Sequence, residues 1–400
     1  MQANLLKMSA EVQNYTIIET FEGLEAFYEE NKSVEWLGFD TEFVGEKRYH
    51  TLLCLIQIST INGYFLIDPI KLKDVSLFLK LLEDPNIIKI THAGENDYRL
   101  IKKNYDVLPR NIFDIQVAAG FVGYKYPISF GKIVEKEAKV FLSKGYTVSD
   151  WESRPFNQKQ LKYALDDVVY LKQIYDRLRA KLETLDRLEW VEEEFKKMET
   201  AEYYYIDPLR EAFQNSLILG LSSKEQVFLI RIYEWRRSEA ERKDYSKEMV
   251  LPAKYIGAIV RNVKSGKGSL LNHRRIPNKI IENNWDKFLE IYNRPITEEE
   301  LALLENIPPP TNDYTQEDTL IEMLSLIIRY ICDEKKIAPD LVIPRSGFKK
   351  MKGDSTFFDE SYASGWRKKL LGETMINWLR NRGNLYLILE DDRFTLRFKE

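Results

Sequence analysis

The chain has 400 residues, of which 44% are hydrophobic, and its formal net charge is −4. This length can bury two or three hydrophobic cores, but no run reaches the roughly 18–20 apolar residues that a membrane-spanning helix needs. Two cysteines lie far apart, and only three histidines are present. These counts argue against a disulfide framework and a multi-histidine zinc site. With no signal-peptide pattern at the start, we expect a cytoplasmic protein that has no membrane partner.

Strand-like and helix-like patterns alternate through the first half of the chain. Strands are predicted at about 15–19, 34–42, 51–59, 63–67, 87–91 and 111–114, and helices at about 21–31, 74–83, 97–104, 156–183 and 189–197. Thr20 can cap the first helix, and Asn157 with Gln160 matches a capping box. Asn62-Gly63 has the turn chemistry of a hairpin. This order indicates a mixed α/β sheet flanked by helices.

Helical patterns dominate the second half. Helices are predicted at 223–240, 252–263, 277–292, 316–334 and 368–381, with a basic, glycine-rich loop at 265–269. Pro308-Pro-Pro310 has the composition of a linker. The alternating residues of 385–398 predict a terminal hairpin around Asp391-Asp392.

Four carboxylates stand out in the first half: Asp40, Glu42, Asp97 and Asp167. Asp40 and Glu42 follow a buried strand two residues apart, so their side chains point the same way. Tyr163 precedes Asp167 by one helical turn and shares its helix face. If the strand and the helices meet, the four acids converge.

Such a set of hard oxygen donors suits Mg²⁺ or Mn²⁺. Two such ions, about 3.5–4 Å apart, could stabilise both the attacking and the leaving oxygen in phosphodiester cleavage. An isolated Asp-x-Glu is more often a solvated surface or turn. The ordered set of acids is what favours catalysis here.

Three segments carry a family resemblance: Phe39-Asp-Thr-Glu-Phe43, His92-Ala-Gly-Glu-Asn-Asp-Tyr98 and Tyr163-Ala-Leu-Asp-Asp-Val168. They resemble the three exonuclease motifs of the tyrosine branch of the DEDD superfamily, and within it ribonuclease D. Residues 112–116 and 144–155 also resemble that family. The resemblance covers about the first three hundred residues and implies a ribonuclease H-like α/β exonuclease domain.

The resemblance also implies roles for the acidic residues. Asp40 would bridge two divalent metal ions, Glu42 and Asp167 would hold the ion that carries the attacking water, and Asp97 would serve the second ion. Tyr163 would orient that water, because a phenol with a pKa near 10 is a poor base at neutral pH. Asp166 lies near the same helix face, but the family spacing selects Asp167.

Three more residues are candidates for substrate contact. Phe43 could stack on the terminal base or close the core beneath the acids, and His92 could contact substrate or be a satisfied structural histidine. Lys144 matches a family position near a phosphate, with a loop-ordering surface lysine as the alternative.

A basic run in the second half indicates a nucleic-acid contact. Residues 254–279 contain seven basic side chains and no acidic one: Lys254, Arg261, Lys264, Lys267, Arg274, Arg275 and Lys279. Charge runs are usually solvated faces. This one lies in a segment that resembles the HRDC domain, a small helical nucleic-acid-binding module, which favours contact with phosphates.

The sequence therefore predicts three regions: a 3′–5′ exonuclease domain at 1–205, an all-helical HRDC-like domain at 206–295, and a mostly helical region at 296–400. One interpretation of the third region is a second HRDC-like domain that ends in a β-hairpin. We expect a metal-dependent 3′–5′ exoribonuclease that acts on structured RNA, tRNA precursors foremost. The alternatives are a DNA exonuclease of the same superfamily and a catalytically weak RNA-binding scaffold. Protein partners cannot be named from the sequence.

Overall fold

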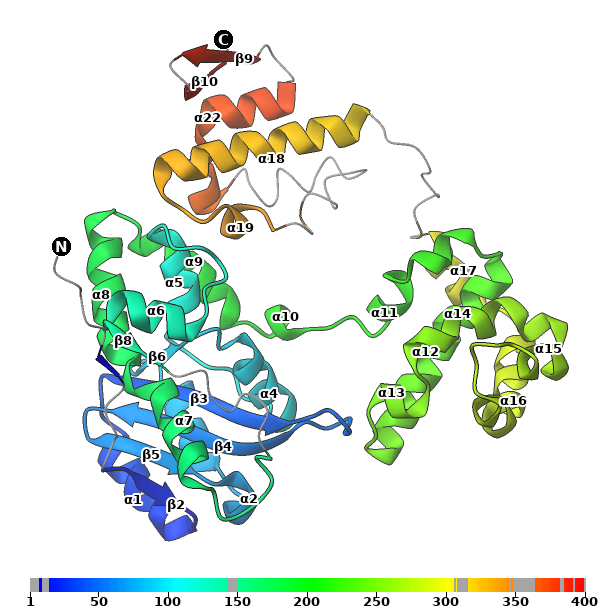
Figure 1. The fold of residues 1–400 in the computed structure, drawn as a ribbon, viewed down its shortest axis with the longest axis horizontal. Coiled ribbons are helices and arrows are strands. Elements are labelled where there is room, and N and C mark those ends of the chain that lie inside the picture. Colours follow the sequence, from blue (N-terminus) through cyan, green and yellow to red (C-terminus); the bar gives the residue numbers. More distant parts are fainter. Residues whose placement is uncertain are drawn as a thin grey trace. The chain divides into compact units, whose positions relative to one another are not determined.

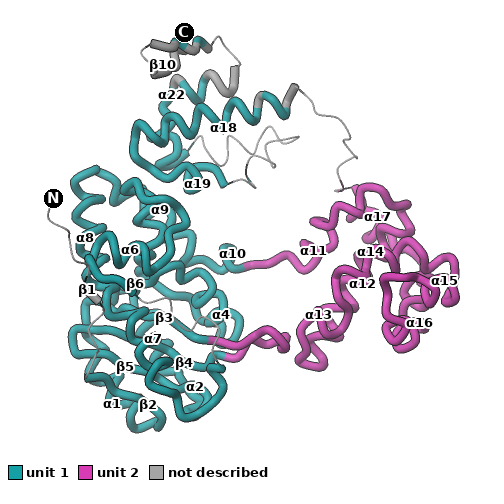
Figure 2. The backbone as a smooth tube through the Cα atoms, in the orientation of Figure 1, with its two compact units in different colours: residues 1–42, 53–204, 314–400 teal, residues 43–52, 205–313 magenta. Residues whose placement is uncertain are grey.

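The computed structural model describes residues 7–8, 14–142, 150–305, 307, 316–344, 347, 364–381, 385–390 and 393–398 (Figure 1). They divide into two units, shown in Figure 2. One unit contains residues 1–42, 53–204 and 314–400, and the other contains 43–52 and 205–313. This division differs from the three consecutive regions expected from the sequence, because the end of the chain shares a unit with its beginning.

A six-stranded mixed sheet forms the centre of the first unit, in the order β2-β5-β4-β3-β6-β7. The strands are β2 Thr16–Ile18, β3 Trp36–Val44, β4 Leu52–Thr60, β5 Gly63–Ile67, β6 Ile88–Thr91 and β7 Ile112–Asp114. β4 and β5 pair antiparallel, whereas β2–β5, β3–β6 and β6–β7 pair parallel. β1 Lys7–Met8 pairs with β8 Val140–Phe141 in a separate ladder. The predicted mixed α/β sheet is confirmed.

Helices cover both faces of this sheet: α1 Phe21–Asn31, α2 Pro69–Leu72, α3 Ser76–Glu83, α4 Glu95–Tyr105, α5 Ile115–Phe121, α6 Phe130–Glu137, α7 Gln158–Val169, α8 Leu171–Thr184, α9 Leu188–Met198 and α10 Ala201–Tyr204. On the α1 and α3 face, Phe27 packs on Phe65 and Phe39 on Phe78. On the opposite face, the Ser59 hydroxyl donates to the carbonyl of Val168 at the end of α7.

Local signals predicted several helix starts correctly. Thr20 caps α1 by accepting from the Gly23 amide, and Asn157 with Gln160 forms the capping box of α7. The single helix expected at 156–183 is wrong, because α7 ends at Val169 and α8 begins at Leu171. No glycine or proline marks this break, and Tyr170 between the two helices keeps φ −96° and ψ −6°.

The last part of the chain adds α18 Gln316–Lys335, α19 Pro339–Val342, α22 Gly365–Asn381 and the antiparallel hairpin of β9 Leu385–Glu390 and β10 Arg393–Phe398. It shares the core of the first unit, where buried Trp366 stacks on Trp190 and packs edge-on against Phe121. The terminal hairpin is confirmed. The expected linker at 308–310 lies outside the described residues.

The second unit is helical and has its own core, which includes Phe228, Ile259 and Phe288. Its elements are α11 Arg210–Phe213, η1 Ser216–Gly220, α12 Ser223–Lys243, α13 Lys247–Val250, α14 Ala253–Asn262, η2 Val263–Ser265, α15 Lys267–Leu271, α16 Asn278–Asn293 and α17 Glu298–Glu305. The loop expected at 265–269 is wrong in part, because α15 begins at Lys267.

Residues 43–52, the connection between β3 and β4, also belong to the second unit. The Ser246 amide donates to the Lys47 carbonyl at 3.0 Å, and the His50 amide donates to the Asp244 carboxylate at 2.8 Å. These bonds hold the connection against the end of α12. Within the described residues, no helix is long and apolar enough to cross a membrane.

Candidate active site

Strand β3 carries Asp40 and Glu42 on the face of the sheet that α7 and α8 cover. A Cβ atom on Gly38 would meet the side chains of Ser59 and Leu171, so position 38 faces these helices. Phe39 faces the opposite side, where its ring packs on Phe78 and Tyr98. Side chains alternate along a strand, so Asp40 and Glu42 follow Gly38.

Helix α7 brings Asp167 to these two acids. Carboxylate oxygens of Asp40, Glu42 and Asp167 all lie within 4.8 Å of one another. The phenol of Tyr163, one turn earlier on α7, lies close enough for the charges of Asp167, Glu42 and Asp40 to act on it. Asp166 instead forms an ion pair with Lys162 at 3.0 Å. The arrangement therefore favours Asp167 over Asp166 as the functional acid.

Asp97 approaches from α4 and is not part of this three-carboxylate group. Its side chain is buried and accepts a hydrogen bond from the hydroxyl of Thr41, which lies between Asp40 and Glu42 on β3. Its charge still raises the pKa of Asp40, Glu42 and Asp167. Thr41 was missed by the sequence analysis, because no local pattern shows that α4 packs against β3.

The acids are strongly perturbed where they meet. Burial, reinforced by the charges of Asp97, Asp167 and Glu42, raises the pKa of Asp40 well above its ordinary value. Burial is also the first cause that raises the pKa of Glu42 to about 8, of Asp97 to about 7 and of Asp167 to about 8. Like charges this close cannot all ionise without a compensating cation.

This donor set fits a divalent metal ion. It offers three converging carboxylates and a fourth acid behind them, all hard oxygen ligands of the kind that Mg²⁺ and Mn²⁺ prefer. A bound cation would let the acids ionise, which burial and mutual repulsion otherwise oppose. Asp40, Glu42 and Asp167 are the residues placed to hold it.

The phenol of Tyr163 has a different environment. Burial, followed by the charges of Asp167, Glu42 and Asp40, raises the pKa of Tyr163 above its ordinary value. The ring of Tyr163 packs against the ring of Trp151 in a tilted arrangement, with 6.2 Å between the ring centroids. Tyr163 therefore stays protonated at neutral pH and can donate a hydrogen bond, but it does not act as a base.

The three predicted substrate contacts have different positions. His92 is mostly buried, and its Nε2 lies 2.9 Å from the Ile128 carbonyl, a contact that fits a structural histidine. Phe43 follows Glu42 on β3, and its side chain is 40% exposed. Lys144 lies outside the described residues.

The segment before α7 is fastened to the sheet by Arg154. Its guanidinium donates to both carboxylate oxygens of buried Asp68, at 2.5 and 2.9 Å, and to the Cys54 carbonyl at 2.7 Å. Asp68 also caps α2. This clamp fixes the start of the helix that carries Tyr163 and Asp167.

The basic run of the second unit is fully on the surface. All seven of its predicted phosphate-binding residues are exposed: Lys254 and Arg261 on α14, Lys264 on η2, Lys267 on α15, Arg274 and Arg275 in the following turn, and Lys279 on α16. Lys264 is already engaged, because its Nζ donates to Glu225 at 3.0 Å. Contact with nucleic acid by these residues stays a prediction.

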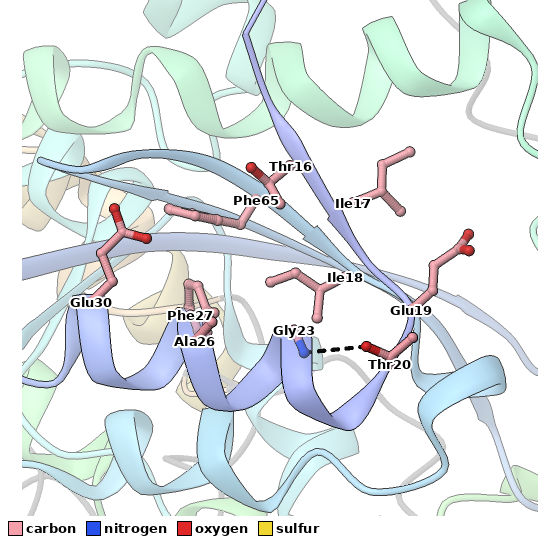
Figure 3. A pocket seen from close by; sticks show the side chains of 10 residues that line it. All are labelled: Thr16, Ile17, Ile18, Glu19, Thr20, Gly23, Ala26, Phe27, Glu30 and Phe65. Carbon is pink, nitrogen blue, oxygen red and sulfur yellow. Dashed lines mark hydrogen bonds between the residues drawn. The ribbon is translucent and has the colours of Figure 1, made fainter.

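A hollow of about 480 Å³ lies elsewhere in the first unit, between β2 and α1 (Figure 3). Ile17, Ile18, Phe27 and Phe65 line it, with Glu19 and Glu30 at its margins. None of the four candidate acids is among its lining residues, so this hollow is separate from the acidic cluster.

Comparisons with known proteins agree with this geometry. A family model described as a 3′–5′ exonuclease matches residues 15–183. Ribonuclease D of Bartonella henselae is 26% identical over 363 residues, which cover 89% of this chain and 88% of the relative. Ribonuclease D of a Shewanella species is 32% identical over 235 residues, covering 59% of this chain and 61% of that one.

A solved structure extends the likeness to the whole fold. The crystal structure of Escherichia coli RNase D, described as an exoribonuclease involved in structured RNA processing, matches with a TM-score of 0.79 and 24% identity. The match covers 92% of this chain and 99% of that one. At this identity, the likeness concerns the fold.

Proposed function

We infer that this chain, which belongs to the ribonuclease D family of 3′–5′ exoribonucleases, uses divalent metal ions to release nucleoside 5′-monophosphates one at a time from RNA ends. The observation that carries this inference is the meeting of carboxylate oxygens of Asp40, Glu42 and Asp167 within 4.8 Å, with the phenol of Tyr163 beside them on α7. Converging carboxylates can hold the ions that metal-dependent phosphodiester hydrolysis uses, and a nearby phenol can orient the attacking water.

The proposed reaction is hydrolysis of the last phosphodiester bond. A water oxygen attacks the phosphorus, the bond from phosphorus to the 3′ oxygen breaks, and the shortened RNA keeps a 3′ hydroxyl. Two divalent ions, when bound, would supply a nucleophile at neutral pH and stabilise the charge on the leaving oxygen. Asp40, Glu42 and Asp167 would hold these ions, and Asp97 would support them from α4.

Tyr163 would act on the water and not as a metal ligand. Its raised pKa keeps the proton on the phenol, so the side chain orients the water by hydrogen bonding. Its place on α7, one helical turn before Asp167, keeps the phenol on the same helix face as that acid. Phe43 would contact the terminal nucleotide with its exposed ring, and Lys144 would approach a phosphate.

The preferred substrates are the 3′ ends of structured RNAs, with tRNA precursors foremost. Two observations support this choice: the Escherichia coli relative is described as processing structured RNA, and the helical unit exposes seven basic side chains. Phosphate contacts from these side chains would give affinity without reading sequence. A DNA exonuclease would use the same acids, and the 2′ hydroxyl would separate the two substrates.

The test uses RNA and DNA oligonucleotides of the same sequence, labelled at the 5′ end, with Mg²⁺ or Mn²⁺ and with a chelator as control. We expect a ladder from the 3′ end of RNA that needs metal and disappears in Asp40→Ala. A ladder on DNA at the same rate would favour the DNA exonuclease. Binding of RNA without cleavage under all conditions would favour the scaffold.

A further inference from the structure

Gln57, in the middle of β4, is the most unusual polar residue of the sheet. Its side chain is fully buried, yet neither the Nε2 nor the Oε1 atom has a hydrogen-bond partner among the residues that the structure describes. The polar neighbours on the same strand are satisfied. Ser59 donates to the Val168 carbonyl at 3.1 Å, and Thr60 donates to the Asn31 side chain at 2.7 Å.

The pairing of β4 with β5 shows which face Gln57 occupies. Ile58 pairs with Phe65, whose ring packs on Phe27 of α1, so Ile58 faces the α1 side. Adjacent side chains alternate, so Gln57 and Ser59 face the other side. That side is covered by α7, as the bond from Ser59 to Val168 shows.

The neighbouring strand places Asp40 opposite Gln57. β3 and β4 are neighbours joined only by residues 45–51, a connection too short for parallel strands, so they run antiparallel. A Cβ on Gly38 would lie 2.5 Å from the Ser59 hydroxyl oxygen, which marks these two positions as cross-strand neighbours. Two residues further along each strand, the neighbours on the same face are Asp40 and Gln57.

A buried amide without hydrogen-bond partners destabilises the fold. Such groups are rare in native proteins, and each one calls for an explanation. The amide of Gln57 can both donate through Nε2 and accept through Oε1. It can therefore donate to a carboxylate oxygen on the neighbouring strand through Nε2. Leucine or methionine would fill the same space with no polar atom to leave unpaired.

We propose that Gln57 is a positioning residue for the metal site: its Nε2 donates to the Asp40 carboxylate across the β3–β4 pair, and so orients that carboxylate for metal binding. This inference rests on the proposed metal-dependent function. Partners that orient a metal ligand typically change metal affinity or activity by about 10- to 100-fold when they are removed.

The experiment compares the wild-type chain with Gln57→Leu and Gln57→Met, and with Ser59→Ala as a matched control on the same strand and face. Thermal unfolding is followed after treatment with a chelator. Mn²⁺ affinity is measured by electron paramagnetic resonance, and kcat and KM are measured on a short RNA. Mn²⁺ binding does not depend on turnover, so it reports on the site separately from activity.

We expect both Gln57 variants to unfold without metal at a temperature no lower than that of wild type, because an unsatisfied amide has been removed. Their Mn²⁺ affinity should fall by about 10-fold or more, and kcat should fall while KM changes little. Ser59→Ala should show the reverse pattern, with lower stability and unchanged Mn²⁺ affinity.

Two results would overturn the proposal. One is wild-type Mn²⁺ affinity in both Gln57 variants. The other is a large loss of stability without metal in both variants, or failure of both to fold, because either would assign the amide to the fold. Failure of the wild-type chain to bind Mn²⁺ is a separate outcome, since it would remove the proposed function itself.

Discussion

At the scale of single residues, the acidic cluster brings together groups that repel one another. Burial and mutual charge raise the pKa values of Asp40, Glu42, Asp97 and Asp167 above their ordinary values. Without a cation, the fold must keep these acids partly protonated. Substitution of any of these acids should therefore abolish activity and leave the fold intact. This pattern would distinguish a catalytic role from a structural one.

Removal of a single acid tests this directly. Asp40→Ala or Asp167→Asn should lower kcat by several orders of magnitude, because metal chemistry supplies several kcal/mol of transition-state stabilisation. The metal-free variants should unfold at the same or a higher temperature than wild type, since a repulsive charge is gone. The measurements are single-turnover kinetics on RNA and thermal unfolding with chelator. An Asp40→Ala protein that trims RNA at close to the wild-type rate would contradict the assignment.

The phenol should behave differently from the acids. Tyr163→Phe removes a hydrogen-bond donor while keeping the ring, so kcat should fall by roughly 10²-fold or more, with Mn²⁺ affinity close to wild type. Kinetics and a Mn²⁺ titration of the same preparation distinguish the two effects. If Tyr163→Phe weakened Mn²⁺ binding as much as Asp167→Asn does, Tyr163 would have to be counted among the groups that hold the metal.

The raised pKa values also predict how stability depends on pH. For an acid whose pKa is raised by folding, the native state binds more protons than the unfolded state, so the free energy of unfolding falls as pH rises. Folding raises the pKa of Glu42 from 4.5 to about 8 and the pKa of Asp167 from 3.8 to about 8. The metal-free protein should therefore lose stability between about pH 4 and pH 7.

Denaturant titrations at several pH values measure this slope, and Asp167→Asn serves as the matched control with a shallower slope. Saturating Mg²⁺ should flatten or reverse the trend, because metal binds the ionised acids. Above pH 7, buried Lys89 acts in the opposite direction, since its pKa is lowered to about 7. A metal-free stability that is constant or increases from pH 4 to pH 7 would contradict the raised pKa values.

At the scale of elements, the sequence predicted what local patterns encode. The strand that carries Asp40 and Glu42, the caps at Thr20 and Asn157, and the i, i+4 pair of Tyr163 and Asp167 all depend on nearby residues. The strands and most long helices were correct for the same reason.

The rest depends on packing that no local pattern reveals. The break between α7 and α8 at Tyr170 has no glycine or proline, and short helices such as α5 and α6 were not predicted. The bond from Thr41 to Asp97 and the position of Gln57 opposite Asp40 require knowing which strand and helix lie side by side. The convergence of Asp40, Glu42 and Asp167 could therefore be predicted from the sequence, but the contacts that support these acids could not.

The clamp before α7 gives a prediction at this scale. Arg154→Met leaves the carboxylate of Asp68 buried without its partner, and breaking such a pair typically costs about 3–5 kcal/mol. The free energy of unfolding should fall by that order. Lys287→Met, which removes an exposed pair with Glu290, should change it by less than about 0.5 kcal/mol.

Urea titrations of the two variants measure the difference, and the variant Arg154→Met should also lose part of its activity as α7 loosens. The bond from Arg154 lowers the pKa of Asp68. The destabilisation should therefore shrink below about pH 4, where Asp68 is protonated in the unfolded chain. Equal effects of the two substitutions at neutral pH would show that the clamp does not fasten α7.

At the scale of the whole molecule, we propose that catalysis and RNA binding belong to different units. The acids lie in the first unit, and the exposed basic run lies in the second. Lys264 should be left out of a test of grip, because it supports Glu225 in the capping box of α12. Lys267, Arg274 and Arg275 are exposed and are the better choice.

Replacing these three residues with glutamine should weaken binding to structured RNA and make it less sensitive to salt. Each lost phosphate contact lowers the salt slope by about 0.7 for single strands to 0.9 for duplex, so the triple variant should lose roughly 2 to 3 units. The turnover of a short oligonucleotide should be nearly unchanged. Binding is measured by fluorescence anisotropy across a range of salt concentrations.

A matched control replaces three basic residues of the same unit that lie outside the run: Arg242 and Lys243, paired with Glu239, and Lys287, paired with Glu290. The control variant has the same net charge as the test variant, so a general charge effect would weaken both equally. If the test variant bound structured RNA with wild-type affinity and salt dependence, the run would be a solvated surface.

The connection at 43–52 has a consequence for how the protein is made. Its Lys47 carbonyl and His50 amide find their partners at Ser246 and Asp244, so nearly two hundred residues must be synthesised before these bonds can form. During translation, this connection therefore lacks its partners for some time after the residues of the acidic cluster up to Asp167 have left the ribosome. A protein cut after residue 204 would keep all four acids, but it would lose both the partners of this connection and the part of the first unit's core that residues 314–400 supply, so its folding yield should fall.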